Sequence, residues 1–200
     1  MNLRSIVLFA VSLALPVLAC AMSSSSSPAP APSKDAGTFQ RIEIKAAKGS
    51  PLPYTIEVPQ GWQGRQEEKF PGLWIGPADA KAPDDPRLIW VRGSTVSMAK
   101  PDEIAANIKA NDASHAEWTA PRVEVKDLGG VKGVLVQMDT GEGDKARSSL
   151  TLKVPLPGTN TSVDFRATAA RGDFPKQLPL FEKILLSVRP VAPAADAAKK

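Results

Sequence analysis

The chain of 200 residues has one cysteine, one histidine and one tyrosine. A single cysteine cannot form a disulfide within the chain, so other interactions must hold the fold together. One histidine and one cysteine also nearly exclude a zinc site built from the usual nitrogen and sulfur ligands. The net charge is +4, but the basic residues are scattered and form no stripe that would suit nucleic acid. We therefore predict no metal, no cofactor and no nucleic-acid partner.

One apolar run stands out, residues 6–20, which follows Arg4 and ends in small residues around Cys20. The run is too short and wrongly flanked for a membrane span and is typical of an export signal. Its last four residues, Val-Leu-Ala-Cys, resemble a bacterial lipobox. The resemblance implies that residues 1–20 form a lipoprotein signal peptide, with cleavage before Cys20. It also implies a diacylglyceryl thioether and an acylated amine on Cys20.

Lipidation at Cys20 would decide where the protein works, because two or more acyl chains anchor a protein stably in a membrane. In lipoproteins that this chain resembles, Asp after the cysteine commonly retains the protein in the inner membrane. Ala21 stands there instead, which favours the outer membrane, with the protein facing the periplasm. The alternative is ordinary cleavage after Ala21, which would release a soluble periplasmic or secreted protein.

Composition divides the remainder of the chain into three parts. Residues 21–37 are rich in Ser, Pro and Ala and are predicted to be a disordered tether. Residues 190–200 have the same character and are predicted to be a disordered tail. Between them, residues 38–189 are long enough to bury a core as a single globular domain.

The expected elements of this domain are strands, a helix, further strands and a closing helix. The first helix starts at Pro101, which suits a first turn, and the second follows Asp173, which is expected to cap it. Consecutive strands joined by tight turns predict a mainly antiparallel sheet, with the two helices covering its faces. The fold class is therefore an α+β, α-β-α sandwich. The expected strands are 39–45, 54–58, 73–76, 88–91, 123–128, 131–139, 149–155 and 161–169.

Three segments carry a resemblance to a known family: the strand with Pro-Gln-Gly-Trp at 54–62, the turn at 128–133 and the terminal helix at 180–188. In this order they resemble the PsbP/Mog1-like superfamily, and bacterial envelope lipoproteins with this type of domain are similar too. The resemblance implies an α-β-α sandwich with a role in assembly or partner binding. It supplies no catalytic motif.

Residues that could carry chemistry are few. His115 has Ser114 and Glu117 beside it, but catalytic triads are assembled from separate elements, so we predict no catalytic residue. The carboxylates of Asp139, Glu142 and Asp144 lie close together in sequence, as hard cations prefer. Their spacing misses the EF-hand loop, and Lys145 and Arg147 offset their charge, so we predict a hairpin turn instead. A glycine-rich turn at 129–133 leads into a strand, so it is not a phosphate loop.

The tryptophans are better candidates for functional residues than these polar side chains. Two of the four, Trp74 and Trp90, lie in predicted strands and are expected in the core, whereas Trp62 and Trp118 lie in or near connections. Either of the latter two, if exposed, is a candidate contact for a partner, because tryptophan is enriched in binding hot spots.

The sequence thus favours a membrane-tethered envelope lipoprotein that acts as a non-catalytic protein-binding or assembly module, with an envelope protein as its partner. One alternative is a secreted or periplasmic hydrolase that uses carboxylates and His115. Another is a protein that binds a small ligand or lipid between its sheet and a helix.

Overall fold

The computed structural model describes residues 38–45, 51–67, 70–83, 85–95, 97, 100–112, 118–156 and 158–191. The predicted signal peptide, the predicted tether and residues 192–200 of the predicted tail lie outside these residues, as do Cys20 and His115. The tail was expected from residue 190, but Pro190 and Val191 are described and Pro190 belongs to a strand. Neither helix within the described residues combines the length and the apolar character needed to cross a membrane.

The first two predicted strands belong to a small sheet that is separate from the other strands. Strands β1 (Phe39–Lys45) and β2 (Pro51–Pro59) pair antiparallel, and their side chains alternate as half-buried strands require. The short strand β10 (Arg189–Pro190) pairs with β2 on its other edge, which makes a three-stranded sheet from the two ends of the domain. The sequence had given no sign of β10, because two residues are too few to show a pattern.

A second, seven-stranded sheet forms the centre of the domain, and each of its neighbouring pairs is antiparallel. The turn predicted at 129–133 is confirmed, since Gly129 and Gly130 have φ of +84° and +92°. The Asp127 carboxylate accepts hydrogen bonds from both of their backbone N–H groups, at 2.8 and 3.1 Å. The strands in sheet order are β3 (Gln63–Glu67), β4 (Phe70–Gly76), β5 (Ile89–Ser94), β9 (Ser162–Ala170), β8 (Arg147–Pro155), β7 (Lys132–Thr140) and β6 (Trp118–Asp127).

The main core lies between one face of the large sheet, the small sheet and helix α2 (Phe174–Leu185). Phe181, Ile184 and Leu185 of α2 are fully buried in this core. The phenol of Tyr54 in β2 donates a hydrogen bond to the Pro155 carbonyl, and burial raises the pKa of Tyr54 to about 12. One continuous core therefore joins both sheets to α2.

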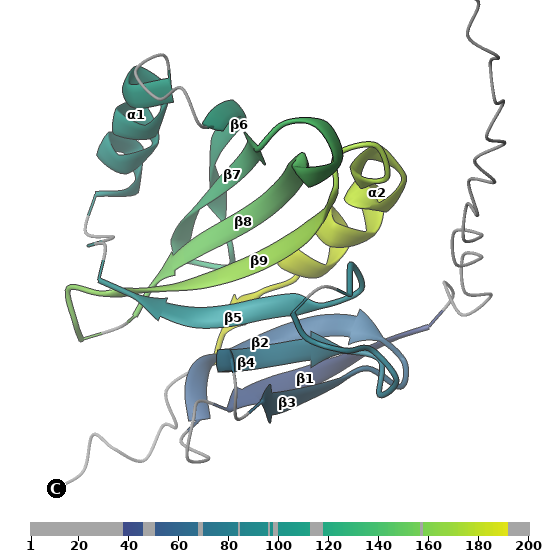
Figure 1. Cartoon of the computed structure of the whole chain (residues 1–200). Coiled ribbons are helices and arrows are strands. Elements are labelled where there is room, and N and C mark those ends of the chain that lie inside the picture. The colour runs from purple at the N-terminus through teal and green to yellow at the C-terminus, as the bar shows by residue number, and fades with distance from the viewer. Residues whose placement is uncertain are drawn as a thin grey trace, which may run out of the picture. The chain divides into compact units, whose positions relative to one another are not determined.

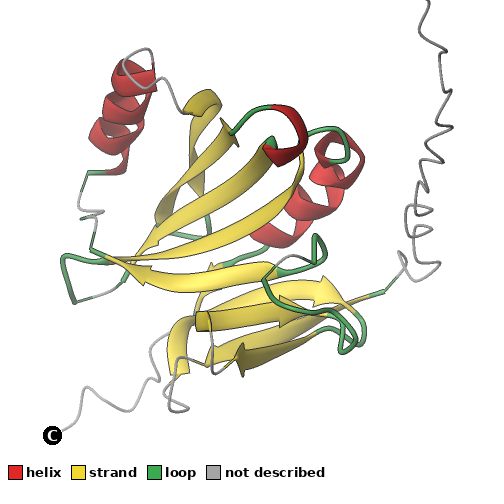
Figure 2. Cartoon of the chain, in the orientation of Figure 1, coloured by secondary structure: helices red, strands yellow, loops and turns green. Residues whose placement is uncertain are grey.

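Helix α1 (Pro101–Asp112) covers the opposite face of the large sheet, over β6 and β7. Ala105 packs there with a second cluster of buried residues, Ala120, Val123, Val134 and Val136. Side chains alternate along β7, so that Val134 and Val136 face α1 while Leu135 faces the main core. Figures 1 and 2 show the two helices on opposite sides of the sheet, so the predicted α+β fold class is confirmed.

Three expectations need correction. The Asp173 side chain makes no capping hydrogen bond to α2, although the helix does start there; its carboxylate instead pairs with Lys176 at 3.3 Å. Trp74 is buried, but Trp90 is half-buried, and the two rings stack with centroids 5.6 Å apart. Strand β3 was missed because its sequence, QGRQE, is polar and lacks the residues typical of strands.

We predict that a chain limited to residues 38–190 unfolds cooperatively with the same thermal midpoint as the mature protein. The reason is that every residue of the buried clusters lies within these limits. The measurement is thermal unfolding of both chains, supported by limited proteolysis, which should cut first within residues 22–37 or after Pro190. Early cuts within residues 131–154 would contradict the account.

Candidate functional site

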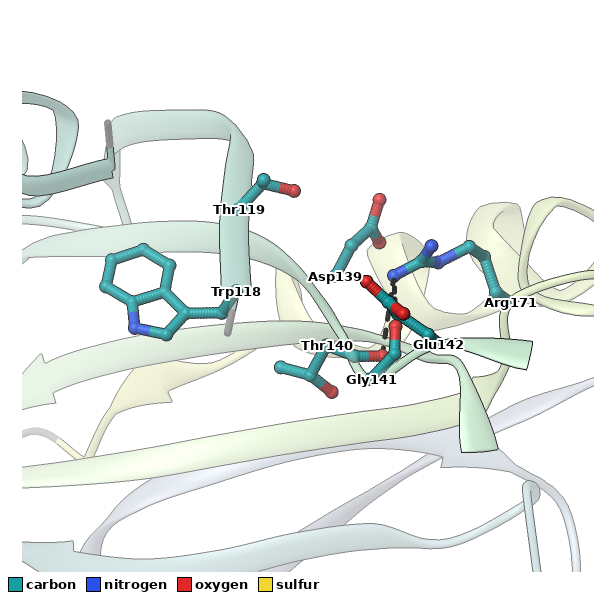
Figure 3. Close-up of a pocket in the computed structure, with 7 residues that line it drawn as sticks. All are labelled: Trp118, Thr119, Asp139, Thr140, Gly141, Glu142 and Arg171. Atoms are coloured by element: carbon teal, nitrogen blue, oxygen red, sulfur yellow. Dashed lines mark hydrogen bonds between the residues drawn. The ribbon is translucent and has the colours of Figure 1, made fainter. Parts of the chain in front are cut away.

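A cavity with a volume of about 710 Å³ opens at one end of the large sheet. Its walls come from the start of β6, from the end of β7 and the loop after β7, and from Arg171, the residue that follows β9. Trp118 pairs with Thr140 across the β6–β7 ladder, and Thr119 pairs with Asp139. The residues that line it, shown in Figure 3, are Trp118, Thr119, Asp139, Thr140, Gly141, Glu142 and Arg171.

The loop that forms the floor of the cavity is held in shape by Arg171. Its guanidinium donates to the carbonyls of Thr140 and Gly141, at 3.4 and 3.2 Å. Its backbone N–H donates to the carbonyl of Ala146, at 3.2 Å. Gly141 is required at this turn, because its φ is +67° and a Cβ there would lie 2.7 Å from the Lys145 carbonyl oxygen.

The charged groups of the cavity are two carboxylates and one guanidinium. The Asp139 carboxylate accepts a hydrogen bond from the Ser148 hydroxyl, at 2.6 Å, which fixes its position. Glu142 and Arg171 are exposed, and Figure 3 shows their side chains directed toward each other and toward Asp139. The site is therefore polar and mildly acidic, with the indole of Trp118 as its large apolar surface.

The two candidate contact residues have different environments. Trp118 is half-buried, packs against the α1 cluster and lines the large cavity. Trp62 has 9% of its surface exposed, belongs to the main core, and its carbonyl accepts a hydrogen bond from Gln40 at 2.8 Å. Trp118 thus exposes more of its side chain to a partner than Trp62 does.

A second cavity lies beside Trp62, between β1 of the small sheet and β3 and β4 of the large one. Its volume is about 170 Å³, which is below the roughly 300–1,000 Å³ of typical small-ligand pockets. It does not lie between the sheet and a helix, where a bound lipid or small ligand had been considered. The larger cavity is therefore the stronger candidate for function.

The larger cavity offers little catalytic chemistry among the residues that line it. Two threonine hydroxyls face two carboxylates and an arginine, with no histidine, lysine or cysteine in the set. The described residues also contain no group of three or more His, Cys, Asp or Glu side chains placed to hold a metal ion. His115, the candidate general base of the alternative hydrolase hypothesis, precedes Trp118 by three positions but lies outside the described residues.

Further along β6, an ion-pair network joins the strand to α2. Arg122 contacts Glu124 with 2.9 Å between Nε and Oε1, and it also contacts Glu182 of α2. Lys126 contacts the other oxygen of Glu124 at 2.6 Å. The hydrogen bond from Arg122, followed by that from Lys126, lowers the pKa of Glu124 to about 2.

This network makes a testable contribution to stability. Because the folded pKa of Glu124 lies below its ordinary value of 4.5, its contribution is present above pH 4.5 and is lost as the pH falls toward 2. Glu124 is more than a third exposed, so solvent screening limits the contribution to about 1 kcal/mol or less. We expect Glu124→Gln to be less stable than the unaltered protein at pH 6 by that amount, and equally stable near pH 2. Denaturant unfolding across this range is the measurement, and a difference that persists at pH 2 would contradict the assignment.

Comparisons with known proteins concern the fold. No protein-family model and no curated protein matches the chain. Among solved structures it is similar to LpqN of Mycobacterium tuberculosis, described as involved in cell envelope biogenesis, with a TM-score of 0.51 and 15% identity over 77% of this chain and 92% of LpqN. At this identity the likeness shows a shared fold and leaves function to the site itself.

Two further solved structures are similar at TM-scores below 0.5. One is PsbP of Synechocystis sp. PCC 6803, with a TM-score of 0.48 and 18% identity over 76% of this chain and 92% of that protein. The other is the Ran-binding protein Mog1p of Saccharomyces cerevisiae, with a TM-score of 0.45 and 13% identity over 77% of this chain and 97% of that protein.

Sequence reasoning found part of this site. Trp118 was singled out, Glu142 was placed in a hairpin turn, and Asp139 lies at the end of β7, just before that turn. Arg171 was not expected at the cavity, because nothing in its local sequence links it to Thr140, which lies 31 positions earlier. The signal that could have found it is the strand order, since β8 joins β7 to β9 and brings the ends of all three together.

Proposed function

We propose that the chain is a lipid-anchored protein of the bacterial cell envelope whose domain, residues 38–189, binds a protein partner and catalyses no reaction. The observation that carries the proposal is the open cavity beside the half-buried Trp118. It combines an aromatic surface with charged groups on a rigid turn, which is the composition of many binding hot spots.

The chemistry of the cavity indicates the kind of surface that a partner would present. Its two carboxylates outnumber its one guanidinium, so a basic group on the partner would be complementary. An apolar side chain next to that group could pack on the indole of Trp118. Trp62 is the weaker candidate contact, because little of it is exposed.

The proposed location rests on the sequence. A lipid anchor on Cys20 would hold the domain at a membrane, and Ala21 favours the outer membrane with the domain facing the periplasm. The similar fold of LpqN, a protein described as involved in cell envelope biogenesis, is in keeping with this location. Residues 21–37 would act as the tether that lets the domain reach a partner.

Site-specific photo-crosslinking in intact cells tests the proposal. A photoreactive side chain is placed at Glu142 or Thr119, both exposed residues that line the cavity. The matched control carries it at Lys176, an exposed residue of α2 that does not line the cavity. We expect one discrete protein adduct from the cavity positions and none from Lys176. Identical adducts from all three positions, or none from either cavity position, would contradict the proposal.

A further inference from the structure

The face of the large sheet that α1 covers continues beyond that helix onto β8, β9 and β5. These strands lie side by side in Figure 1. Their apolar residues, such as Leu152, Phe165 and Val91, face the main core. Because side chains alternate along a strand, the residues between them point to the other face. That face carries the polar block, which we define as Trp90, Arg92, Thr151, Lys153, Asp164 and Arg166.

The strand register arranges the polar block in two rows. Arg92 pairs with Asp164, and Asp164 pairs with Lys153, so these three side chains are direct neighbours across the strands. Two positions along, Trp90 pairs with Arg166, and Arg166 pairs with Thr151. Residues directly opposite in antiparallel strands have Cβ atoms about 5 Å apart, and diagonal neighbours are still within reach of long side chains. Arg92 and Lys153 therefore flank Asp164, the one carboxylate of the polar block, and Arg166 lies two positions along the same strand.

That carboxylate neutralises one of the three cations. Asp164 has 1% of its surface exposed, and its Oδ2 lies 2.7 Å from Lys153 Nζ. Its other oxygen, Oδ1, is buried without a hydrogen-bond partner. Three positive charges and one negative charge leave the polar block with two positive charges in excess.

The two guanidinium groups have no carboxylate of their own among the described residues. Arg166 donates from Nε to the Thr151 hydroxyl at 3.1 Å, and burial, followed by the nearby Arg92, lowers its pKa. Arg92 lies over the Trp90 ring, with its guanidinium carbon 4.7 Å from the ring centre. Arg166 is half-buried and Arg92 is exposed, and neighbouring cations repel each other unless an anion accompanies them.

Unsatisfied polar atoms point to the same place. The described residues contain three buried side-chain polar atoms without a hydrogen-bond partner: Trp74 Nε1, Ser162 Oγ and Asp164 Oδ1. Trp74 pairs with Trp90 across β4 and β5, and Ser162 lies two positions before Asp164, so all three belong to this face of the sheet. Trp74 Nε1 and Ser162 Oγ can donate to an anion, whereas Asp164 Oδ1 is a carboxylate oxygen that can only accept and would not contact a phosphate.

We propose that the polar block binds a phosphate group between the guanidinium groups of Arg92 and Arg166, with Lys153 beside it. A phosphate monoester carries a charge of about −1.5 to −2 at neutral pH, which matches the excess of two positive charges. A ligand carboxylate, with one negative charge, would neutralise only half of this excess positive charge. The planar guanidinium also presents paired N–H donors that fit two phosphate oxygens. The phosphate could belong to a soluble molecule or to a lipid headgroup.

Calorimetric titration of the full chain with inorganic phosphate, in detergent micelles at low salt and neutral pH, tests this proposal. We expect saturable binding and a rise in the unfolding midpoint with phosphate concentration. Arg92→Gln and Arg166→Gln should each weaken binding at least about tenfold. Arg92 is exposed, so its variant should fold even if the Arg166 variant does not. The matched control is Arg147→Gln, which removes the same charge from an exposed residue of β8, roughly 20 Å along the strand from Lys153.

The outcomes separate the possibilities. Absence of saturable binding, acetate binding as tightly as phosphate, or equal weakening by Arg147→Gln would overturn the proposal. A second titration uses short-chain phosphatidic acid as the probe. Binding much tighter than that of inorganic phosphate, and lost in Arg92→Gln, supports the site with a lipid headgroup as the source. Equal binding of the two probes, lost in the same variant, supports it with a soluble phosphate compound.

Discussion

Phe181→Ala is expected to lower the free energy of unfolding by about 3–5 kcal/mol, the range for removing a buried phenylalanine side chain. Phe181 is fully buried where α2 meets the core, and its ring lies 6.0 Å from that of Phe174. Truncation leaves a cavity between the helix and the strands, which the surrounding residues can fill only in part. Equilibrium denaturation at neutral pH is the measurement.

The control for this prediction is Lys176→Ala on the same helix. Lys176 is exposed, and its ion pair with Asp173 spans 3.3 Å at the surface. Its removal should change the free energy of unfolding by no more than about 0.5 kcal/mol. A loss below about 1 kcal/mol for Phe181→Ala would mean that α2 contributes little to stability, contrary to its place in the main core.

Cys20→Ser is expected to move the protein from the membrane fraction to the soluble fraction, or to leave it as uncleaved precursor. The reason is that a serine cannot carry the thioether-linked lipid that we propose for Cys20. Fractionation of cells that produce the unaltered chain and the variant at equal levels is the measurement.

Mass spectrometry of the unaltered protein tests the same claim independently. The account predicts a mature chain that starts at Cys20 and carries the mass of the added acyl groups. The control is Ser23→Ala, which alters a residue of the proposed tether and should leave the protein in the membrane fraction. An unlipidated mature chain that starts at Met22 would contradict lipidation and support release by cleavage after Ala21.

The strands and helices that the sequence predicted are those with strong local signals. Residues 39–45 and 149–155 alternate clearly between apolar and polar side chains, and both are strands in the structure. Pro101 likewise predicted the start of α1. Strand β3 was missed, because pairing with β4 determines its conformation more than its own polar sequence does.

The candidate sites were harder to predict, because both depend on which strands pair. Arg171 reaches the cavity through the order of β7, β8 and β9, which no local pattern reveals. The polar block likewise requires the register that places Arg92, Asp164 and Lys153 in one row from three separate strands. Alternation within each strand showed which residues share a face, but it could not show which strands are neighbours.

The central claim is that the domain acts by binding a partner beside Trp118 and not by catalysis, and one comparison tests it most directly. Crosslinking yield from the Glu142 position is titrated against partner concentration for the unaltered chain, Trp118→Ala and His115→Ala, at matched abundance. The account predicts that Trp118→Ala weakens capture by about 2 kcal/mol or more, roughly thirtyfold, because it removes the aromatic contact. His115→Ala should leave capture and the cellular phenotype unchanged. Loss of the phenotype in His115→Ala with fold and abundance intact, together with unaltered capture by Trp118→Ala, would contradict the account and favour an enzyme.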